Sequence, residues 1–277
     1  MSAQSVTAGD NQPAQVSYLM ESSREGERLR QQERANPSAE RLLQAGLCAG
    51  QRVVDLGCGA GAVMPAILDI VGPGGSVTGV DASADRVVEA RRLIEGVPNA
   101  EAIVGAFPST GLPEASFYFS WSQFVFEYLP QPELALREMI RVTRPGGTVA
   151  VADVDGLGLS FWPRPPVVEE GLAVLMQGLS ALGFDFFIGR KLYTLFREAG
   201  LREVSVHLSS LYVSAGANER LIADYAQRFE VLKPVAIKVF GDARRYDDFA
   251  SAYLDLLADS DALKYAVVLT VAGRRER

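Results

Sequence analysis

The sequence has 277 residues, of which 48% are hydrophobic and 22% are charged, with a net charge of −7 at pH 7. This composition excludes a disordered chain, and the negative charge disfavours nucleic acid and anionic membranes as partners. The polar N-terminus contains no signal-peptide pattern and no apolar stretch is long enough to span a membrane, so we expect a cytoplasmic protein. Cys48 and Cys58 predict no disulfide framework, and a single histidine, His207, predicts no metal site.

In chain order, residues 1–13 are expected to be a disordered tail, followed by one or two helices within residues 16–34. Another helix is expected to start at Asn36-Pro37-Ser38, which is a capping signal, and to end at Leu47. From Arg52 onward, short apolar strands alternate with helices, which is the pattern of a parallel sheet with right-handed crossovers. The predicted strands are 52–56, 76–81, 101–104, 116–122, 148–154, 203–208 and 266–272.

These elements predict an α/β fold, namely a Rossmann-like, doubly wound, mostly parallel seven-stranded sheet. Two segments interrupt its regular alternation, at about residues 156–187 and 211–259. Both contain several aromatic side chains, among them Trp162 and Tyr225. We expect these segments to form helical cap insertions above the ligand end of the sheet.

The stretch Val53–Ala62, VVDLGCGAGA, places three glycines directly after a short apolar strand that contains Asp55. The strand ends at Leu56 and a helical pattern begins at Ala60, so the glycines lie on a strand-to-helix turn. Glycines at such a turn let the backbone approach a ligand that a Cβ atom would exclude. The turn is therefore predicted to be a ligand site.

A dinucleotide-binding turn is one interpretation of these glycines, with Ala62 in the last place of the Rossmann pattern. Asp55, however, stands where such a site usually keeps an apolar residue, and its charge would repel a pyrophosphate and attract a cation. Asp81 closes the next strand, where a carboxylate accepts both hydroxyls of an unphosphorylated ribose. The sequence also contains no Tyr-x-x-x-Lys pair for nicotinamide reduction. These residues describe a ligand with a ribose and a cationic centre but no phosphate.

Three stretches resemble the class I S-adenosylmethionine-dependent methyltransferases, of the small-molecule, methyltransferase-domain type. They are VVDLGCGAGA (53–62), VTGVDAS (77–83) and FYFSWSQFVFEYLPQPELALREMIRVTRPGG (117–147). The resemblance covers residues 50–155 closely, and 188–201 and the last strand loosely. It implies S-adenosylmethionine as cofactor, an N-terminal tail and lid helices in residues 1–47, and the methyltransferase domain in residues 48–277. Tyr18 and Gln32 would then be contacts of the lid.

The resemblance also implies roles for individual residues. Asp55 would lie near the ammonium of the methionine part, and Asp81 would hold the ribose. Ser122 and Gln123, at the end of a predicted strand, would face the methionine chain and the sulfonium. The implied cofactor-binding residues are Asp55, Gly57, Gly59, Asp81, Ala82, Ala106, Phe107, Ser122 and Gln123.

Two positions depart from the family pattern. The family usually has an Asp after the glycine that follows its third strand, where it binds the adenine amino group, but this sequence has Ala106. We expect Phe107 to stack on or border the adenine, while backbone groups contact its edge. Tyr118 replaces a second usual Asp, at the start of the fourth strand. Neither change affects Asp55 or Asp81, so cofactor binding is still expected.

The expected function is methyl transfer to a small, fairly apolar molecule such as a secondary metabolite, because the cap insertions are rich in aromatic residues. Aligning the reactants supplies most of the catalysis, and a general base is needed only for a weakly acidic hydroxyl or a carbon acid. His207 fits a structural role in a strand better than the role of a base. The candidates for a base are Tyr128, Glu127, Asp153, Asp155 and His207.

Two other functions remain open. A fold relative could bind S-adenosylmethionine yet catalyse a reaction without methylation, such as a cyclisation, and the glycine pattern keeps an NAD-dependent oxidoreductase under consideration. The expected partner is a small-molecule acceptor, without nucleic acid or membrane, and a homodimer is left open.

Overall fold

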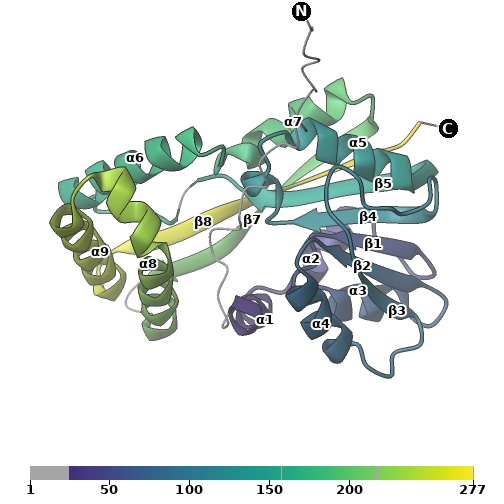
Figure 1. Ribbon diagram of the computed structural model, residues 1–277, viewed down its shortest axis with the longest axis horizontal. Coiled ribbons are helices and arrows are strands. Elements are labelled where there is room, and N and C mark those ends of the chain that lie inside the picture. Colours follow the sequence, from purple (N-terminus) through teal and green to yellow (C-terminus); the bar gives the residue numbers. More distant parts are fainter. Residues whose placement is uncertain (1–24, 157, 216–217, 277) are drawn as a thin grey trace, which may run out of the picture.

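The computed structural model describes residues 25–156, 158–215 and 218–276. The expected tail and Tyr18 lie outside this part of the chain. At its centre is an eight-stranded mixed sheet with the order β3-β2-β1-β4-β5-β8-β6, in which β7 also pairs with β8 (Figure 1). The doubly wound, mostly parallel sheet that the sequence predicts is confirmed, with eight strands in place of seven.

Five strands form the parallel part of the sheet and three pair antiparallel. The parallel strands are β1 (Arg52–Leu56), β2 (Ser76–Asp81), β3 (Ala100–Val104), β4 (Phe117–Gln123) and β5 (Thr143–Val154). The other three are β6 (Ser160–Trp162), β7 (Arg202–Ala215) and β8 (Leu263–Arg274).

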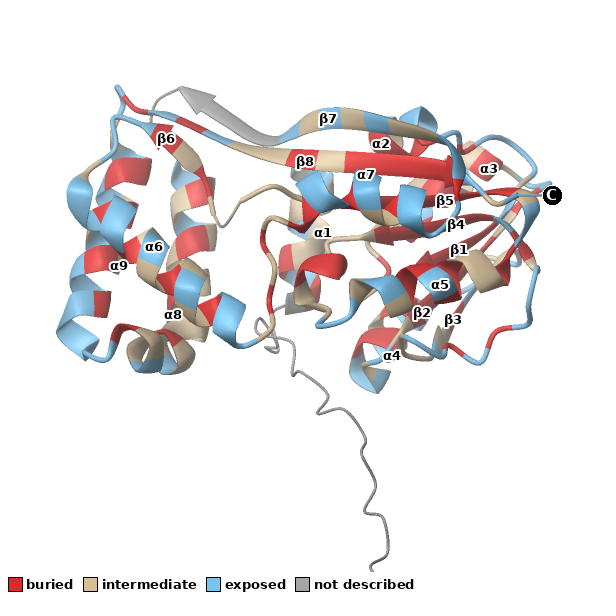
Figure 2. Cartoon of the chain, turned by 90° about the horizontal axis from the view of Figure 1, so that it is seen from above, coloured by how far each residue is buried: buried red, intermediate tan, exposed pale blue. Residues whose placement is uncertain are grey.

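Helices cover both faces of the parallel strands, so the central residues of β1, β2, β4 and β5 are buried. On one face α2 (Ala39–Gln44), α3 (Met64–Val71) and α4 (Ala84–Leu93) pack against a core that includes Trp121. On the other face α5 (Pro132–Val142) and α7 (Ile188–Glu198) enclose a second core. Figure 2 shows the central strands buried and the outward helix faces exposed.

The strand order reverses direction between β1 and β4, since the chain adds β2 and β3 on one side and β4 and β5 on the other. In open α/β sheets, ligands bind outside the carboxyl ends of the strands at such a switch point. The glycine turn after β1 lies there. Helix α1 (Glu25–Ala35) lies between these strand ends and the cap (Figure 1).

The cap has its own aromatic core, built by α6 (Pro166–Ala181), α8 (Glu219–Phe240) and α9 (Ala243–Ala258). Strands β7 and β8 run on from the sheet toward these helices, as Figure 1 shows. Residues 211–215, which we expected in the second insertion, belong to β7, because its pairing with β8 continues to Ala215 opposite Leu263. Among the described helices, none is both long enough and apolar enough to cross a membrane.

Candidate functional site

The glycine turn after β1 has a backbone conformation that side chains disfavour. Gly57 and Gly59 have φ angles of 81° and 53°, in the left-handed region. A Cβ atom on Gly57 would lie 2.4 Å from Cγ2 of Val125. The N–H groups of Gly57 and Cys58 both donate to the carbonyl of Val80, at 2.7 and 3.0 Å, so the turn is anchored to β2. Glycine is therefore favoured at both positions by the positive φ angle, and at Gly57 also because a side chain would collide with Val125.

Asp81 connects the end of β2 to this turn. Its Oδ2 accepts the N–H of Gly59 at 2.8 Å, and its Oδ1 accepts the N–H of Ser83 at 2.9 Å, where α4 begins. Burial raises the pKa of Asp81, while these two hydrogen bonds act in the opposite direction. Each carboxylate oxygen can accept a further hydrogen bond. Asp81 can thus receive two hydroxyl donors from a ligand, as a ribose would supply.

Asp55 is buried at the end of β1, with 2% of its surface exposed. Its Oδ2 has no hydrogen-bond partner among the described residues, although the residue lines the cavity. Burial, followed by the charges of Asp81 and Glu33, raises the pKa of Asp55 to about 8. A buried acceptor without a partner at a cavity wall fits a ligand that brings a donor, such as an ammonium. These residues therefore fit S-adenosylmethionine.

We expect Asp55 to make the protein less stable as the pH rises from about 4 to 8. The folded state retains a proton on this carboxyl up to about pH 8, whereas the unfolded chain releases it near pH 4, so the free energy of unfolding falls across this window. One carboxyl contributes at most about 1.4 kcal/mol per pH unit. Urea unfolding of Asp55→Asn between pH 5 and 8 should therefore show a shallower decline than wild type.

The control for this experiment is Asp69→Asn, because Asp69 is an exposed carboxyl on α3, away from the cavity. It should keep the wild-type dependence of stability on pH. If Asp55→Asn and wild type decline in parallel, Asp55 does not hold its proton in the folded state.

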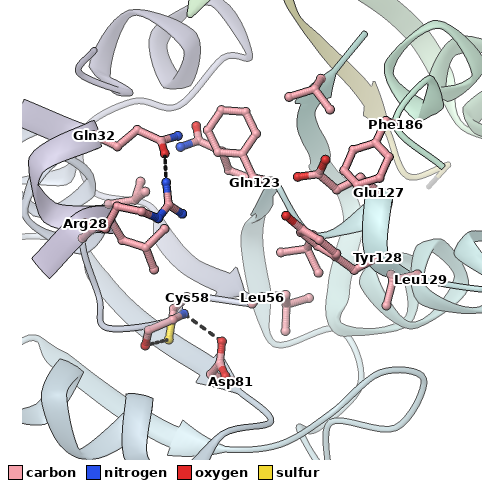
Figure 3. A pocket seen from close by; sticks show the side chains of 18 of the residues that line it. Arg28, Gln32, Leu56, Cys58, Asp81, Gln123, Glu127, Tyr128, Leu129 and Phe186 are labelled. Atoms are coloured by element: carbon pink, nitrogen blue, oxygen red, sulfur yellow. Dashed lines mark hydrogen bonds between the residues drawn. The ribbon is translucent and has the colours of Figure 1, made fainter. Parts of the chain in front are cut away.

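One cavity of about 1500 Å³ extends from the glycine turn to the cap. This volume exceeds the roughly 300–1000 Å³ of a typical single-ligand pocket, so it can accommodate a cofactor and a second molecule. Figure 3 shows Cys58 and Asp81 at one end and, farther along, Arg28 and Gln32 opposite Glu127. The turn and the cap thus face a shared space.

The structure places eight of the nine expected cofactor residues on the cavity wall, namely Asp55, Gly57, Gly59, Asp81, Ala82, Ala106, Phe107 and Gln123. Ser122 differs from the expectation. It is fully buried, and its hydroxyl donates to the carbonyl of Leu56 at 2.8 Å, so it fastens β4 to β1 and does not line the cavity. Neighbouring residues of a strand point to opposite faces, which separates Ser122 from Gln123.

Gln123 is oriented by the helix that precedes β1. Its Oε1 accepts hydrogen bonds from Ser38 Oγ at 3.0 Å and from Arg41 Nε at 3.2 Å. Both donors are buried. The N-terminal segment therefore helps to build the site, because it fixes which end of the Gln123 amide faces the cavity.

The expected adenine region is apolar at its side chains. Ala106 brings no side-chain acceptor, and its carbonyl already accepts the N–H of Ser109 at 2.9 Å. Phe107 lines the cavity and meets the ring of Phe126 edge-on, with centroids 6.2 Å apart. The neighbouring Gly105 leaves no space for a Cβ, which would lie 2.8 Å from the Thr110 carbonyl. This region can contact an aromatic ring chiefly through packing.

Of the candidate bases, Glu127 and Tyr128 line the cavity and Asp153 does not. Glu127 and Tyr128 belong to the short helix η1 (Phe126–Tyr128). Asp153 is fully buried on β5, where its Oδ2 accepts the N–H groups of Phe126 at 2.9 Å and Glu127 at 3.3 Å. Asp153 therefore positions η1 and does not reach the cavity.

The two remaining candidates, His207 and Asp155, are not arranged to act as a base either. His207 lies on β7 opposite Thr270 and does not line the cavity. Asp155 lines the cavity, but Arg190 binds its carboxylate through Nε at 2.6 Å and Nη2 at 3.1 Å. Neither arrangement favours a general base.

Several cavity residues on α1 and α8 are absent from the sequence-based set. Gln32 was expected as a lid contact and does line the cavity. Arg228 follows Tyr225 by three residues, so helical spacing from an expected cap aromatic could have found it. The residues missed by sequence reasoning include Arg28, Glu33 and Arg228.

The two cap aromatics singled out in the sequence differ in position. Tyr225 lines the cavity and is 6% exposed. Trp162 is 73% exposed on β6 and lies outside the cavity, so it is not among the cap aromatics that line this space. Its neighbour Phe161 is buried in the cap core, as the alternation of a strand requires.

Comparison with known proteins adds independent evidence. Residues 54–151 match the family described as methyltransferase domain. The chain is 34% identical over 180 residues to the demethylmenaquinone methyltransferase of Geobacillus kaustophilus, covering 60% of this chain and 77% of that protein. It is 34% identical over 125 residues to the trans-aconitate 2-methyltransferase of Methylobacterium nodulans, covering 45% of this chain and 46% of that protein.

Among solved structures, a Haloferax volcanii protein in complex with the Trm112 methyltransferase activator superposes with a TM-score of 0.58. The match covers 92% of this chain and 95% of that one at 21% identity, and it shows a shared fold. The chain spans about half the length of the first curated relatives that it matches.

Proposed function

Because the chain belongs to the class I S-adenosylmethionine-dependent methyltransferases, we propose that it methylates a small, fairly apolar molecule bound beneath the cap. A secondary metabolite is one such molecule. The observation that carries this proposal is the continuous cavity, which joins the cofactor residues of the sheet to the aromatic side chains of the cap.

The expected cofactor site comes from residues of the sheet edge. S-adenosylmethionine supplies, when bound, a methyl group activated by its sulfonium. In this proposal Asp81 accepts the ribose hydroxyls and Asp55 accepts a donor from the methionine part, which the hydrogen bonds of Asp81 and the unpartnered oxygen of Asp55 support. Gly57 and Gly59 keep the backbone close to the ligand.

The expected acceptor site comes from the cap. Tyr225, Phe229, Phe249 and Tyr253 line the cavity and pack together, with the rings of Tyr225 and Tyr253 stacked at 5.1 Å. In this proposal, these rings exclude water and hold an apolar acceptor against the sheet edge. Aligning the two reactants in this way can lower the barrier by about 7–11 kcal/mol. Most of the catalysis then comes from positioning.

The proposal is tested by comparing Tyr225→Ala with Trp162→Ala. The wild-type protein is incubated with S-adenosylmethionine and a panel of phenols, hydroquinones and naphthols, and products that gain one CH₂ unit are identified by mass spectrometry. Tyr225→Ala should lower the rate about tenfold or more, as expected when a buried aromatic contact is removed. Its affinity for S-adenosylhomocysteine, measured by calorimetry, should stay within about threefold because the sites use different residues.

Trp162→Ala is the matched control, because it removes an exposed cap aromatic outside the cavity. It should change neither rate nor affinity. Loss of S-adenosylhomocysteine affinity in Tyr225→Ala would contradict the proposal that the sheet binds the cofactor and the cap binds the acceptor. Products of unchanged mass would favour the alternative without methylation, and binding of NADH in place of S-adenosylhomocysteine would favour an oxidoreductase.

A further inference from the structure

The part of the cavity between α1 and η1 contains a carboxyl group that the cofactor residues do not use. Glu127 is 5% exposed and lines the cavity. Figure 3 shows its carboxyl beside the hydroxyl end of Tyr128, with Phe186 adjacent and with Arg28 and Gln32 across the space. Cys58 and Asp81 lie farther away, at the glycine turn. Glu127 therefore belongs to the acceptor part of the cavity.

The backbone around Glu127 is held from two sides. Its N–H and that of Phe126 donate to Oδ2 of Asp153, and its carbonyl accepts the N–H of Asp185 at 2.8 Å. The loop that contains Asp185 also carries Phe186, which packs edge-on against Tyr128 with centroids 6.3 Å apart. The carboxyl of Glu127 is thus presented by a rigid frame, as a specificity-determining group requires.

The charges around Glu127 limit what it can recognise. The Tyr128 hydroxyl donates to its carboxyl, which also lies within range of the charges of Asp153, of Arg28 on α1 and of Arg228 on α8. Arg228 is itself paired with Asp224 at 2.9 Å. Two guanidinium groups disfavour an ammonium, and two buried carboxyls disfavour an acid. Burial, then Asp153, raises the pKa of Glu127, and a carboxyl oxygen accepts a hydrogen bond in either protonation state. A neutral O–H donor is the group that this environment favours.

We infer that Glu127 is the specificity-determining anchor of the acceptor site and receives a hydrogen bond from a hydroxyl group on an otherwise apolar, ring-containing acceptor. This inference rests on the proposed function, since it assigns the acceptor class for the same cavity. The ring would lie among the cap aromatics, and its hydroxyl would reach Glu127. An acceptor lacking that hydroxyl cannot make this hydrogen bond, so the Glu127 carboxyl keeps only the donor that Tyr128 supplies.

The test uses two probes with the same ring system, 2-naphthol and 2-methoxynaphthalene, of which only the first donates a hydrogen bond. Binding to the full-length protein saturated with S-adenosylhomocysteine is measured by calorimetry. Wild type should prefer 2-naphthol about tenfold, the value of one well-made hydrogen bond in a buried site. Glu127→Leu should reduce this preference below about twofold, and Glu127→Gln, which keeps one acceptor oxygen, should lie between.

Asp155→Asn is the control, because its carboxylate also lines the cavity but is bound by Arg190. It should keep the wild-type preference. The affinity for S-adenosylhomocysteine shows whether each variant is folded. If Glu127→Leu does not fold, the preference of Glu127→Gln for 2-naphthol tests the role of Glu127. Equal binding of both probes to wild type would overturn this inference but leave the proposed function intact. An unchanged preference in the Glu127 variants would do the same. Failure of both probes to bind would instead overturn the apolar acceptor cavity of the proposed function, and this inference with it.

Discussion

Replacing Gly59 with valine is expected to abolish S-adenosylhomocysteine binding in a protein that still folds. Gly59 has a φ of 53°, a conformation that is strongly unfavourable for a β-branched residue. Its N–H donates to Asp81, so a turn that relaxes the strain also breaks the link to the proposed ribose site. A Cβ here would lie 3.3 Å from Cδ1 of Leu29 on α1, at the cavity wall. Calorimetry should show a loss of affinity of at least about 100-fold.

A matched control separates this effect from backbone strain. Gly96 also has a positive φ, 79°, and a Cβ there would meet no atom within 4 Å. Gly96→Val should carry a similar strain of about 1–2 kcal/mol, measurable by urea unfolding, yet bind S-adenosylhomocysteine normally. If Gly59→Val binds as well as Gly96→Val does, the glycine turn is not part of the cofactor site.

Replacing Asp81 with alanine should weaken S-adenosylhomocysteine binding by about 1.5–3 kcal/mol, or roughly 10- to 150-fold, since charge-assisted bonds to two ribose hydroxyls would be lost. The substitution also removes the acceptors of the Gly59 and Ser83 N–H groups, which loosens the turn and the start of α4. Both effects act in the same direction. Calorimetry measures the affinity, and thermal unfolding measures the cost to the fold.

The control for Asp81 is Asp85→Ala, four residues along the chain. Asp85 is exposed on α4 and does not line the cavity. Its removal should leave the affinity within about twofold. A folded Asp81→Ala protein with wild-type affinity would refute the assignment of Asp81 to the ribose.

The sequence by itself determined the sheet edge that carries the proposed cofactor site. Asp55 and Asp81 could be predicted to converge because each lies at the carboxyl end of its strand, and the carboxyl ends of neighbouring parallel strands meet at one edge. The structure joins the two turns through the Gly59 to Asp81 hydrogen bond, 22 residues apart. Such local signals suffice because strand, glycine turn and helix are each specified within about ten residues of sequence.

The alternation of β4 was a signal that sequence reasoning left unused. Ser122 and Gln123 are adjacent, so they had to point to opposite faces, and only one could line the cavity. The structure buries Ser122 against Leu56 and directs Gln123 to the cavity. The same alternation separates exposed Trp162 from buried Phe161. Which of the two faces lines the cavity, however, depends on the elements that pack around each strand.

Only the tertiary structure decided which residues form the half of the cavity proposed for the acceptor. Asp153 holds the backbone of Glu127 from 26 residues away, and Arg28 faces Glu127 from α1, which precedes the whole sheet in the chain (Figure 3). The cap aromatics meet the sheet because β8 pairs with β5 at one end and with β6 at the other. Helical and strand periods predict which side of an element is buried, but they contain no information about which distant element covers it. The cofactor edge is therefore readable from local pattern, whereas the acceptor site arises from long-range packing.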